Sequence, residues 1–256
     1  MDILKKIVAE KKNYFKIAMV IALLVTMYAL GSSAGLITVS MTDENRYIVV
    51  IDAGHGGNDP GKIVGDVYEK DINLSITLKL KKILEENGIE VVLTRSEDVG
   101  LYAETDSNKK VADMKNRCNI INNCGADILV SIHQNSYSSQ NVKGAQVFFY
   151  EHSTEGEKLA GIIQNSIKSS IDKSNERMHK ANDSYYILLN VSAPAVIVEC
   201  GFLTNPEERK KLLDDSYQEE MANAIAMGIL EYKNSTNTTY NNTSSNTTNF
   251  KTNSGY

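Results

Sequence analysis

The spacing of apolar and polar positions predicts strands and helices in alternation between residues 45 and 233. Short apolar runs bounded by glycine or polar residues predict strands at 47–54, 89–95, 127–135, 144–150 and 193–202. Apolar residues three and four apart predict helices at 69–87, 109–124 and 154–172, with further closing helices within 206–233. Strands that alternate with helices and are apolar throughout are typical of a sheet buried on both faces. We therefore expect an α/β fold: a single domain over residues 42–233, with a mostly parallel twisted sheet of about six strands and helices on both faces.

The first 41 residues follow another pattern. Five lysines between residues 5 and 16 precede an uncharged run from Ile17 to Met41, and Ile17 to Leu30 is almost wholly apolar. This layout is typical of an export signal, or of a membrane anchor that keeps its lysines inside. We expect residues 1–41 to be a basic signal or anchor segment, so that the domain is exported and works in the cell envelope.

Composition restricts the class of protein further. The segment from Asn234 to Tyr256 is rich in Asn, Thr and Ser, and we expect a disordered tail there. A net charge of −5 and the lack of a basic stripe argue against nucleic-acid binding. Cys118, Cys124 and Cys200 lack the C-x-x-C spacing of a zinc site or redox pair, which favours small buried hydrophobic residues.

Three polar residues stand where predicted strands end. His55 follows the first strand, His133 ends the run "ILVSI", and Glu199 ends the run "AVIV". Ligands of open α/β sheets gather beyond the carboxyl ends of the strands. A carboxylate that ends a buried strand costs several kcal/mol unless a cation or hydrogen bonds satisfy it. The three residues therefore predict one site.

Glu69 is the fourth candidate, because it opens the helix that follows the glycine-rich loop after His55. His55, Glu69 and His133 together offer two imidazole nitrogens and one carboxylate oxygen. That set matches catalytic zinc sites, which use three protein ligands and keep a fourth position open for water. Glu199 would then be the carboxylate without a metal bond, which takes a proton from the water and delivers it to a leaving amine.

The same loop allows a second interpretation. Residues 56–62 read G-x-x-x-x-G-K, the first seven positions of a phosphate-binding P-loop. The next residue should be Ser or Thr, but Ile63 stands there. Asp59 would repel phosphate, and Pro60 removes one of the N–H donors of such a loop. These departures favour the metal site over the phosphate site.

The motifs resemble those of the zinc-dependent N-acetylmuramoyl-L-alanine amidases of the amidase-3 family. The resemblance runs from "IVVIDAGHGGNDPG" to "GILEYK", through Glu69-Lys70-Asp71, Thr94-Arg95, Arg117 with Asn122, "ADILVSIHQN" and "VECGFLTN". It implies one Zn²⁺ per chain bound by His55, Glu69 and His133, and Glu199 as the catalytic residue. It also implies cleavage of the amide between muramic acid and the L-alanine of the peptidoglycan stem.

The short domain without an attached wall-binding repeat most resembles the spore-cortex amidases of endospore formers. That implies a role in muramic-δ-lactam formation and germination, with a vegetative cell-wall amidase as the alternative. Without such a repeat, we expect a second envelope protein to aid activity or metal retention. Where the family has a small residue after the second histidine, this chain has Gln134, and we expect Gln134 and Asn135 to contact substrate.

Three other classes remain open from the sequence. An inactive peptidoglycan-binding module could keep the fold without the chemistry. A glycosidase would use Glu69 and Glu199 as paired carboxylates and leave the histidines without a role. A thiol hydrolase would use Cys200, but the neighbouring Glu199 would raise the pKa of that thiol and weaken it as a nucleophile.

Overall fold

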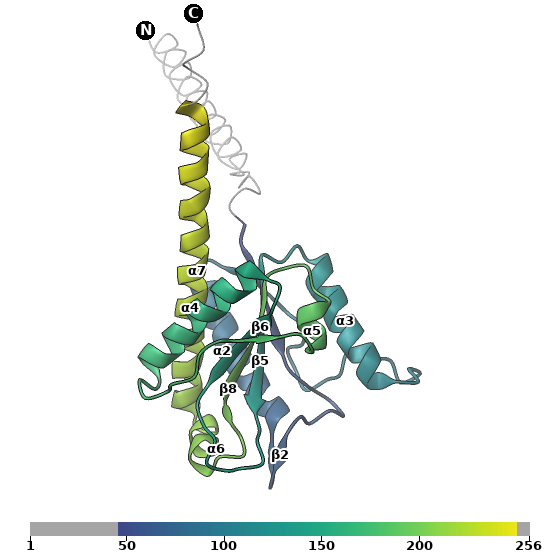
Figure 1. The fold of residues 1–256 in the computed structure, drawn as a ribbon. Coiled ribbons are helices and arrows are strands. Elements are labelled where there is room, and N and C mark those ends of the chain that lie inside the picture. The colour runs from purple at the N-terminus through teal and green to yellow at the C-terminus, as the bar shows by residue number, and fades with distance from the viewer. Residues whose placement is uncertain (1–45, 250–256) are drawn as a thin grey trace, which may run out of the picture. The chain divides into compact units, whose positions relative to one another are not determined.

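A six-stranded sheet built from the apolar runs forms the centre of the fold. The structure is a computed structural model, and it describes residues 46–249. The strands of this sheet are β1 (Ile48–Ala53), β4 (Glu90–Leu93), β5 (Ile128–Asn135), β6 (Gln146–Tyr150), β7 (Lys180–Asn182) and β8 (Ala195–Phe202). Their order in space is β4-β1-β5-β8-β6-β7. Figure 1 shows β5, β6 and β8 in the middle of the fold. β4, β1, β5 and β8 run parallel, whereas β6 is antiparallel to β8 and β7 is parallel to β6. The predicted single α/β domain with a mostly parallel sheet is confirmed.

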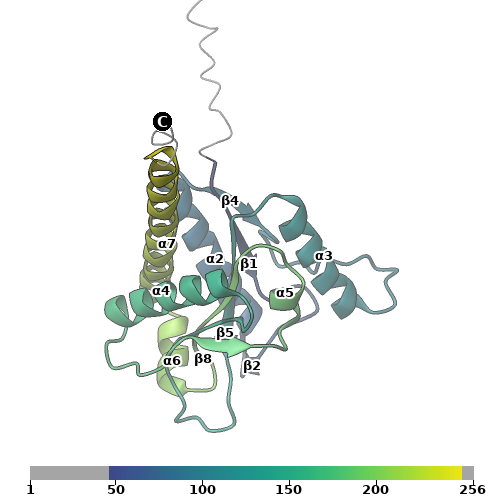
Figure 2. The same ribbon diagram turned by 45° about the horizontal axis from the view of Figure 1, so that its top comes forward.

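Helices cover both faces of the sheet, as strands that are apolar on both sides require. One face carries α2 (Glu69–Glu86), α4 (Thr154–Ser170) and α7 (Asp215–Asn249), and the other carries α3 (Lys109–Asn123) and α5 (Tyr186–Leu189) (Figure 2). α6 (Pro206–Leu212) follows β8. Successive residues of β1 point to opposite faces, so Val49 and Ile51 join the core under α2, whereas Val50 joins the core under α3.

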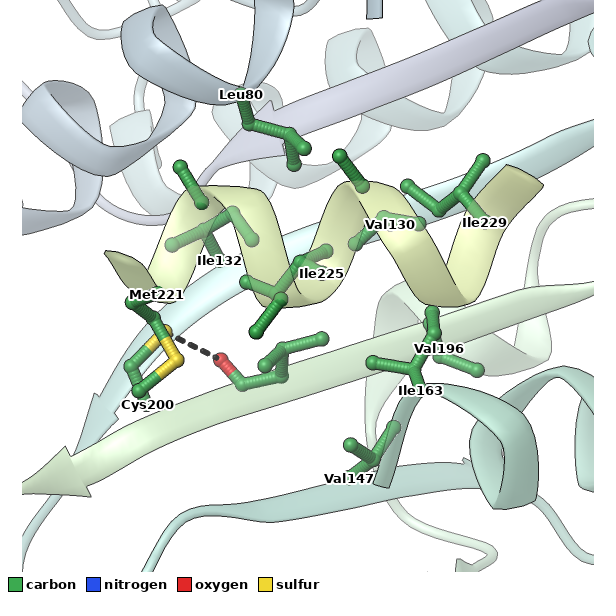
Figure 3. Packing of buried hydrophobic residues seen from close by; sticks show 14 of the residues in the cluster. Leu80, Val130, Ile132, Val147, Ile163, Val196, Cys200, Met221, Ile225 and Ile229 are labelled. Carbon is green, nitrogen blue, oxygen red and sulfur yellow. Dashed lines mark hydrogen bonds between the residues drawn. The ribbon is translucent and has the colours of Figure 1, made fainter. Parts of the chain in front are cut away.

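The larger core lies between the sheet and the helices α4 and α7. Figure 3 shows Ile225 of α7 over Val130 of β5, with Ile163 of α4 close by. An added Cβ at Gly228 would lie 2.9 Å from the Cα of Ile163, so the two helices pack closely where α7 has no side chain. Burial of each such isoleucine contributes about 1.5–3 kcal/mol. This core supports the strands whose far ends carry the polar candidates.

Capping side chains set the starts of three helices. Asn108, Ser153 and Asn205 precede α3, α4 and α6, and their side-chain oxygens accept hydrogen bonds from N–H groups of the first turn. α2 follows Tyr68, which provides no side-chain cap. The side chain of Glu69, the first residue of α2, belongs to the candidate site.

Three short elements are absent from the sequence prediction. They are the hairpin of β2 (Ile63–Val64) and β3 (Val67–Tyr68), strand β7, and helix α5. Each strand or helix among them is two to four residues long, so periodicity cannot identify it. β7 pairs with β6 through its backbone, while the side chains of Lys180 and Ala181 are exposed.

The structure describes most of the C-terminal segment and none of the first 45 residues. Helix α7 continues to Asn249, where the sequence predicted a disordered tail from Asn234. No glycine or proline lies between residues 234 and 249 to end the helix. The predicted signal or anchor segment 1–41 lies outside the described residues. In the range 46–249, no helix is both long and apolar enough to cross a membrane.

Candidate metal centre

Three side chains converge at the carboxyl end of the sheet. His55 follows β1, His133 lies near the end of β5, and Glu69 opens α2. Oε1 of Glu69 lies 3.2 Å from Nε2 of His55 and 3.0 Å from Nδ1 of His133. One ligand atom from each of the three residues lies within 4.8 Å of the other two, so they can hold one metal ion. The structure thus brings together the three residues that the sequence offered as ligands.

The backbone is strained where it presents His55. This residue has a φ of +61°, in the left-handed region that residues other than glycine rarely adopt. Nη2 of Arg117 donates a hydrogen bond of 2.6 Å to the carbonyl of His55 and helps to hold this conformation. The preceding Gly54 has no room for a side chain, because an added Cβ would lie 2.2 Å from Nε2 of His133. Strain that the surroundings maintain at such a position is typical of functional sites.

Asp52, Arg95 and Arg117 form a buried network that we call the floor of the site. Nη1 of Arg117 donates to Oδ1 of Asp52 at 2.6 Å, and the hydroxyls of Thr94 and Ser131 donate to the same carboxylate. Arg95 donates to the carbonyl of the last residue of β1 and to that of the residue after it. Burial raises the pKa of Asp52, but the charge of Arg117 and the two hydroxyls outweigh it and lower the pKa to about 2. The floor is therefore a fixed, charged support for the histidine loop.

Glu69 is buried and ionised. The N–H of Gln134 donates to its Oε1 at 3.1 Å, and the N–H of Lys62 donates to its Oε2 at 2.8 Å. Burial raises its pKa, but the hydrogen bonds and charges of the two histidines outweigh that effect and hold the pKa far below its usual range. A carboxylate held in this state is suited to bind a cation and unsuited to act as the acid of a glycosidase.

Gln134 and Asn135, predicted to contact substrate, do not line the cavity of the site. Gln134 is 3% exposed, and its Nε2 donates to Oδ1 of Asn73 at 3.2 Å. Asn73 in turn donates to Glu69 at 3.3 Å. The carbonyl of Asn135 accepts a hydrogen bond from the N–H of Leu203. Gln134 thus supports Glu69 through Asn73 and through its own backbone N–H. This position differs from the predicted role in substrate contact.

Asp59 is a site residue that the sequence interpretation did not assign. Its Oδ2 lies 3.0 Å from Nδ1 of His55, and this contact leaves Nε2 of the ring facing Glu69. Burial lowers the pKa of His55, but Glu69 and Asp59 together outweigh it and raise the pKa to about 9. A carboxylate on the second ring nitrogen fixes the tautomer and orientation of a metal-binding histidine. The available signal was an acidic residue four positions after His55.

Glu199 stands beside the three ligands without joining them. It lies opposite His133 in the pairing of β8 with β5. Glu199 is 8% exposed, and its Oε2 is buried without a hydrogen-bond partner. Burial raises the pKa of Glu199 to about 7, an effect that the charge of Glu69 reinforces and the two histidines oppose. A carboxylate near its pKa at neutral pH can both accept and donate a proton.

A cavity of about 430 Å³ opens in front of these residues. Its wall includes His55, His133 and Glu199 together with side chains from the start of α3 and of α5. A volume in this range can hold part of a small-molecule or peptide substrate. The candidate metal ligands and Glu199 are therefore open to a ligand from one side.

Two alternatives from the sequence lose their support. In the glycine-rich loop, the N–H groups of Gly57 and Gly61 donate to the carboxylates of Asp98 and Asp59, so acidic side chains occupy the positions that phosphate would need. The thiol of Cys200 is fully buried, and burial together with Glu199 raises its pKa, so it is a poor nucleophile.

The comparisons with known proteins agree on one family. The Amidase_3 family model, described as N-acetylmuramoyl-L-alanine amidase, matches residues 49–231. The germination-specific N-acetylmuramoyl-L-alanine amidase of Bacillus subtilis is 35% identical over 188 residues, which cover 72% of this chain and 79% of that protein.

Solved structures give the same result. The CwlD amidase of Clostridioides difficile, in complex with the GerS lipoprotein, matches with a TM-score of 0.72 and 41% identity, covering 74% of this chain and 99% of that one. AmiC2, an N-acetylmuramoyl-L-alanine amidase of Nostoc punctiforme, matches with a TM-score of 0.63 and 37% identity, covering 73% of this chain and 97% of that one.

Proposed function

Because the chain belongs to the Amidase_3 family and is an N-acetylmuramoyl-L-alanine amidase acting on peptidoglycan, we propose that it hydrolyses this amide with one zinc ion held by His55, Glu69 and His133. The observation that carries the proposal is the convergence of two imidazoles and one buried, ionised carboxylate at the mouth of a cavity.

The donor set and its surroundings fit zinc. Two nitrogens and one oxygen with a free fourth position form the usual set of a catalytic zinc site. The hydrogen bonds of Glu69 and the contact between Asp59 and His55 hold these donors in place. When bound, zinc would polarise the amide carbonyl and lower the pKa of a water molecule to about 7.

We assign the proton transfers to Glu199. Glu199 lines the cavity beside His55 and His133, so its carboxylate can receive a proton from the attacking water, and its pKa of about 7 lets it return that proton to the leaving amine of L-alanine at neutral pH. The amide C–N bond breaks as the new C–O bond forms, so the products are a lactyl carboxylate and a free amino terminus. The floor takes no part in proton transfer and keeps the histidine loop in position.

The setting that we propose is the spore cortex, where the enzyme would prepare muramic acid for δ-lactam formation and so for germination. The similarity to a germination-specific amidase supports this setting. Relatives that act on the cell wall imply export to the cell envelope. We further propose that residues 42–233 are the exported catalytic domain and that residues 1–41 export or anchor it.

A second envelope protein completes the proposal. The solved complex of the CwlD amidase with the GerS lipoprotein supports an amidase–lipoprotein pair for this chain as well. Such a partner would aid activity or metal retention. Full activity and one equivalent of tightly held zinc in the isolated protein would contradict this part of the proposal.

The full chain, incubated with purified peptidoglycan with and without zinc, tests the chemistry. We expect new amino termini of L-alanine to form only with zinc, and no new reducing sugar ends. Glu199→Gln should lower the rate by about 10²–10⁴-fold and still bind one equivalent of zinc. Glu220→Gln, which alters an exposed carboxylate of α7, is the matched control and should leave the rate unchanged. New reducing ends in place of amino termini would exclude the amidase.

Deletion of the gene tests the setting. If the enzyme acts in the cortex, spores without it should lack muramic δ-lactam and should fail to complete germination, while vegetative cells divide normally. Normal cortex together with chained or unseparated vegetative cells would assign the enzyme to the vegetative wall instead.

A further inference from the structure

The cavity extends well beyond the candidate metal ligands. Its outer part, which we call the arm, is walled by Lys110 and Met114 of α3 and by Tyr185, Tyr186 and Ile187 at the start of α5. None of these residues belongs to the group of side chains that could hold a metal ion. The arm therefore needs a separate explanation within the amidase reaction.

Helix α3 connects the arm to the floor along one face. Lys110, Asp113, Met114 and Arg117 all line the cavity, and their spacing of three, four and seven residues places them on one side of the helix. Seven residues of α-helix span about 10 Å, so Lys110 lies about two turns from the residue that holds His55. A bound molecule that reaches from the metal end to Lys110 must be about this long.

The acidic groups of the cavity wall other than Glu199 already have cationic partners. Asp52 and Asp113 each lie 2.6 Å from a nitrogen of Arg117, and Asp59 contacts His55. None of these three carboxylates forms an ion pair with a lysine in the part of the chain that the structure describes. None of them therefore contacts Lys110 directly, although the charge of Lys110 acts on Asp59 and helps to lower the pKa of that carboxyl.

The cavity wall includes two neighbouring lysines, Lys109 and Lys110, which differ in their contacts. Nζ of Lys109 lies 2.6 Å from Oε2 of Glu104 and 5.2 Å from the ring centroid of Tyr102. Lys110 forms no ion pair or hydrogen bond with any residue between 46 and 249. Positive charge in the first turn opposes the helix dipole, and α3 has no acidic residue there to offset it. Lys110 therefore has no direct partner within residues 46–249, and its ammonium group is available to a ligand.

We propose that the arm binds the stem peptide of the substrate and that Lys110 pairs with the free carboxylate of its second residue. This inference rests on the proposed amidase function, which places the scissile amide next to Glu199. The stem begins with L-alanine, followed by a D-glutamate joined through its side chain, whose α-carboxylate is either free or amidated. Two extended residues span about 7 Å, and the flexible lysine stem covers the remaining distance.

The rest of the arm suits the first residue of the stem. The wall has an apolar stretch formed by Met114, one turn after Lys110 on α3, by Ile197, two residues before Glu199 on β8, and by Ile187. An alanine methyl group can lie against this stretch without burying a polar atom. The arm would thus contact first a small apolar side chain and then an anion, in the order in which the stem presents them.

A binding experiment with the full chain tests the inference. Glu199→Gln protein loaded with zinc leaves the ligand intact, and calorimetry compares N-acetylmuramoyl-L-alanyl-D-isoglutamate with its isoglutamine counterpart, which has a carboxamide in place of the carboxylate. We expect the carboxylate form to bind about tenfold more tightly, as a charge-assisted hydrogen bond to an exposed lysine would give. Adding Lys110→Met should abolish this preference, and Lys110→Arg should keep most of it. Lys115→Met removes the same charge from an exposed position of α3 and should leave the preference unchanged.

Equal affinity for the two ligands, or an equal loss for both in Lys110→Met, would overturn the inference. The wild-type rate on the same two compounds is measured separately. A carboxylate preference without any hydrolysis would contradict the proposed function alone. Hydrolysis without such a preference would contradict the role of Lys110 alone.

Discussion

Arg117 in the floor of the site and Lys110 in the arm of its cavity lie about two turns apart on α3, yet they differ in burial and in hydrogen bonding. Arg117 in the floor is 2% exposed and donates hydrogen bonds to Asp52, Asp113 and the carbonyl of His55. Lys110 in the arm is exposed and forms no such bond within the described part of the chain. One helix therefore supplies both a fixed support and a free charge.

This difference matches what each region has to do. Groups that transfer protons or hold a metal must keep their positions, because small displacements reduce the rate strongly. A group that pairs with a flexible peptide can remain solvated and mobile until the ligand arrives. We therefore expect substitutions in the floor to alter folding and metal binding, and substitutions in the arm to alter ligand preference alone.

The largest effect should come from Arg117→Met. The change leaves the buried carboxylate of Asp52 without its cation, and loss of one partner of a buried pair costs about 3–5 kcal/mol. Urea unfolding of the wild type and the variant measures this free energy. Arg177→Met is the control, because Arg177 is partly exposed and binds Lys143 and Gln146 outside the site. A loss below about 1 kcal/mol for Arg117→Met would show that the floor is not the rigid region that we describe.

The next effect concerns Glu199, whose substitution should increase the free energy of unfolding. Its pKa is about 7 in the folded protein against 4.5 for an ordinary glutamate, so between these values the unfolded chain loses its proton first. The stability of the metal-free protein should therefore fall as the pH rises through this window and stay low above it. Glu199→Gln removes this loss and should stabilise the metal-free protein at pH 8 by about 3 kcal/mol at most.

Urea unfolding at pH 4 and pH 8 measures the effect, with Glu220→Gln as the exposed control. The two variants and the wild type should have similar stability at pH 4. A Glu199→Gln protein that shows the pH dependence of the wild type would contradict the raised pKa. A loss of stability at the proposed catalytic residue is consistent with a site that is selected for chemistry rather than for folding.

The same contrast explains what the sequence could predict of the fold. The strands and long helices were predictable because each buries a periodic apolar face, as Ile72, Ile76 and Leu80 do on α2. β7 and α5 were not, since β7 is held by backbone pairing with β6 and α5 is a single turn. The continuation of α7 beyond Asn234 was not predictable either, because Asn, Thr and Ser are weak helix formers.

The residues of the site also fall into those that the sequence could predict and those that it could not. His55, Glu69, His133 and Glu199 were predictable because polar residues at strand ends and at a helix start have no role in packing. Asp59 and Lys110 were not, since an acidic residue in a loop or a lysine on a helix is ordinary in sequence. Their roles depend on which side chains the fold places beside them.

A smaller effect should follow from Asp59→Ala. Loss of the carboxylate that orients His55 should lower zinc affinity by about 10–100-fold, while the fold remains intact. Competition with a fluorescent chelator measures the zinc affinity. Asp66→Ala is a matched control, because Asp66 is exposed in the turn of the nearby hairpin. Equal zinc affinities of the two variants would mean that Asp59 does not orient the ring.

The smallest effect should come from Asn108→Ala, at the start of α3 next to the arm. Asn108 caps α3 by accepting a hydrogen bond from the N–H of Val111, and loss of such a cap costs about 1 kcal/mol. Ser153→Ala removes the corresponding cap of α4, far from the cavity, and should cost about the same. Only Asn108→Ala should also weaken binding of the carboxylate ligand, by about two- to threefold, because fraying of the first turn displaces Lys110. If both cap variants bind the ligand equally well, then the arm does not require an ordered start of α3, and Lys110 acts through its charge alone.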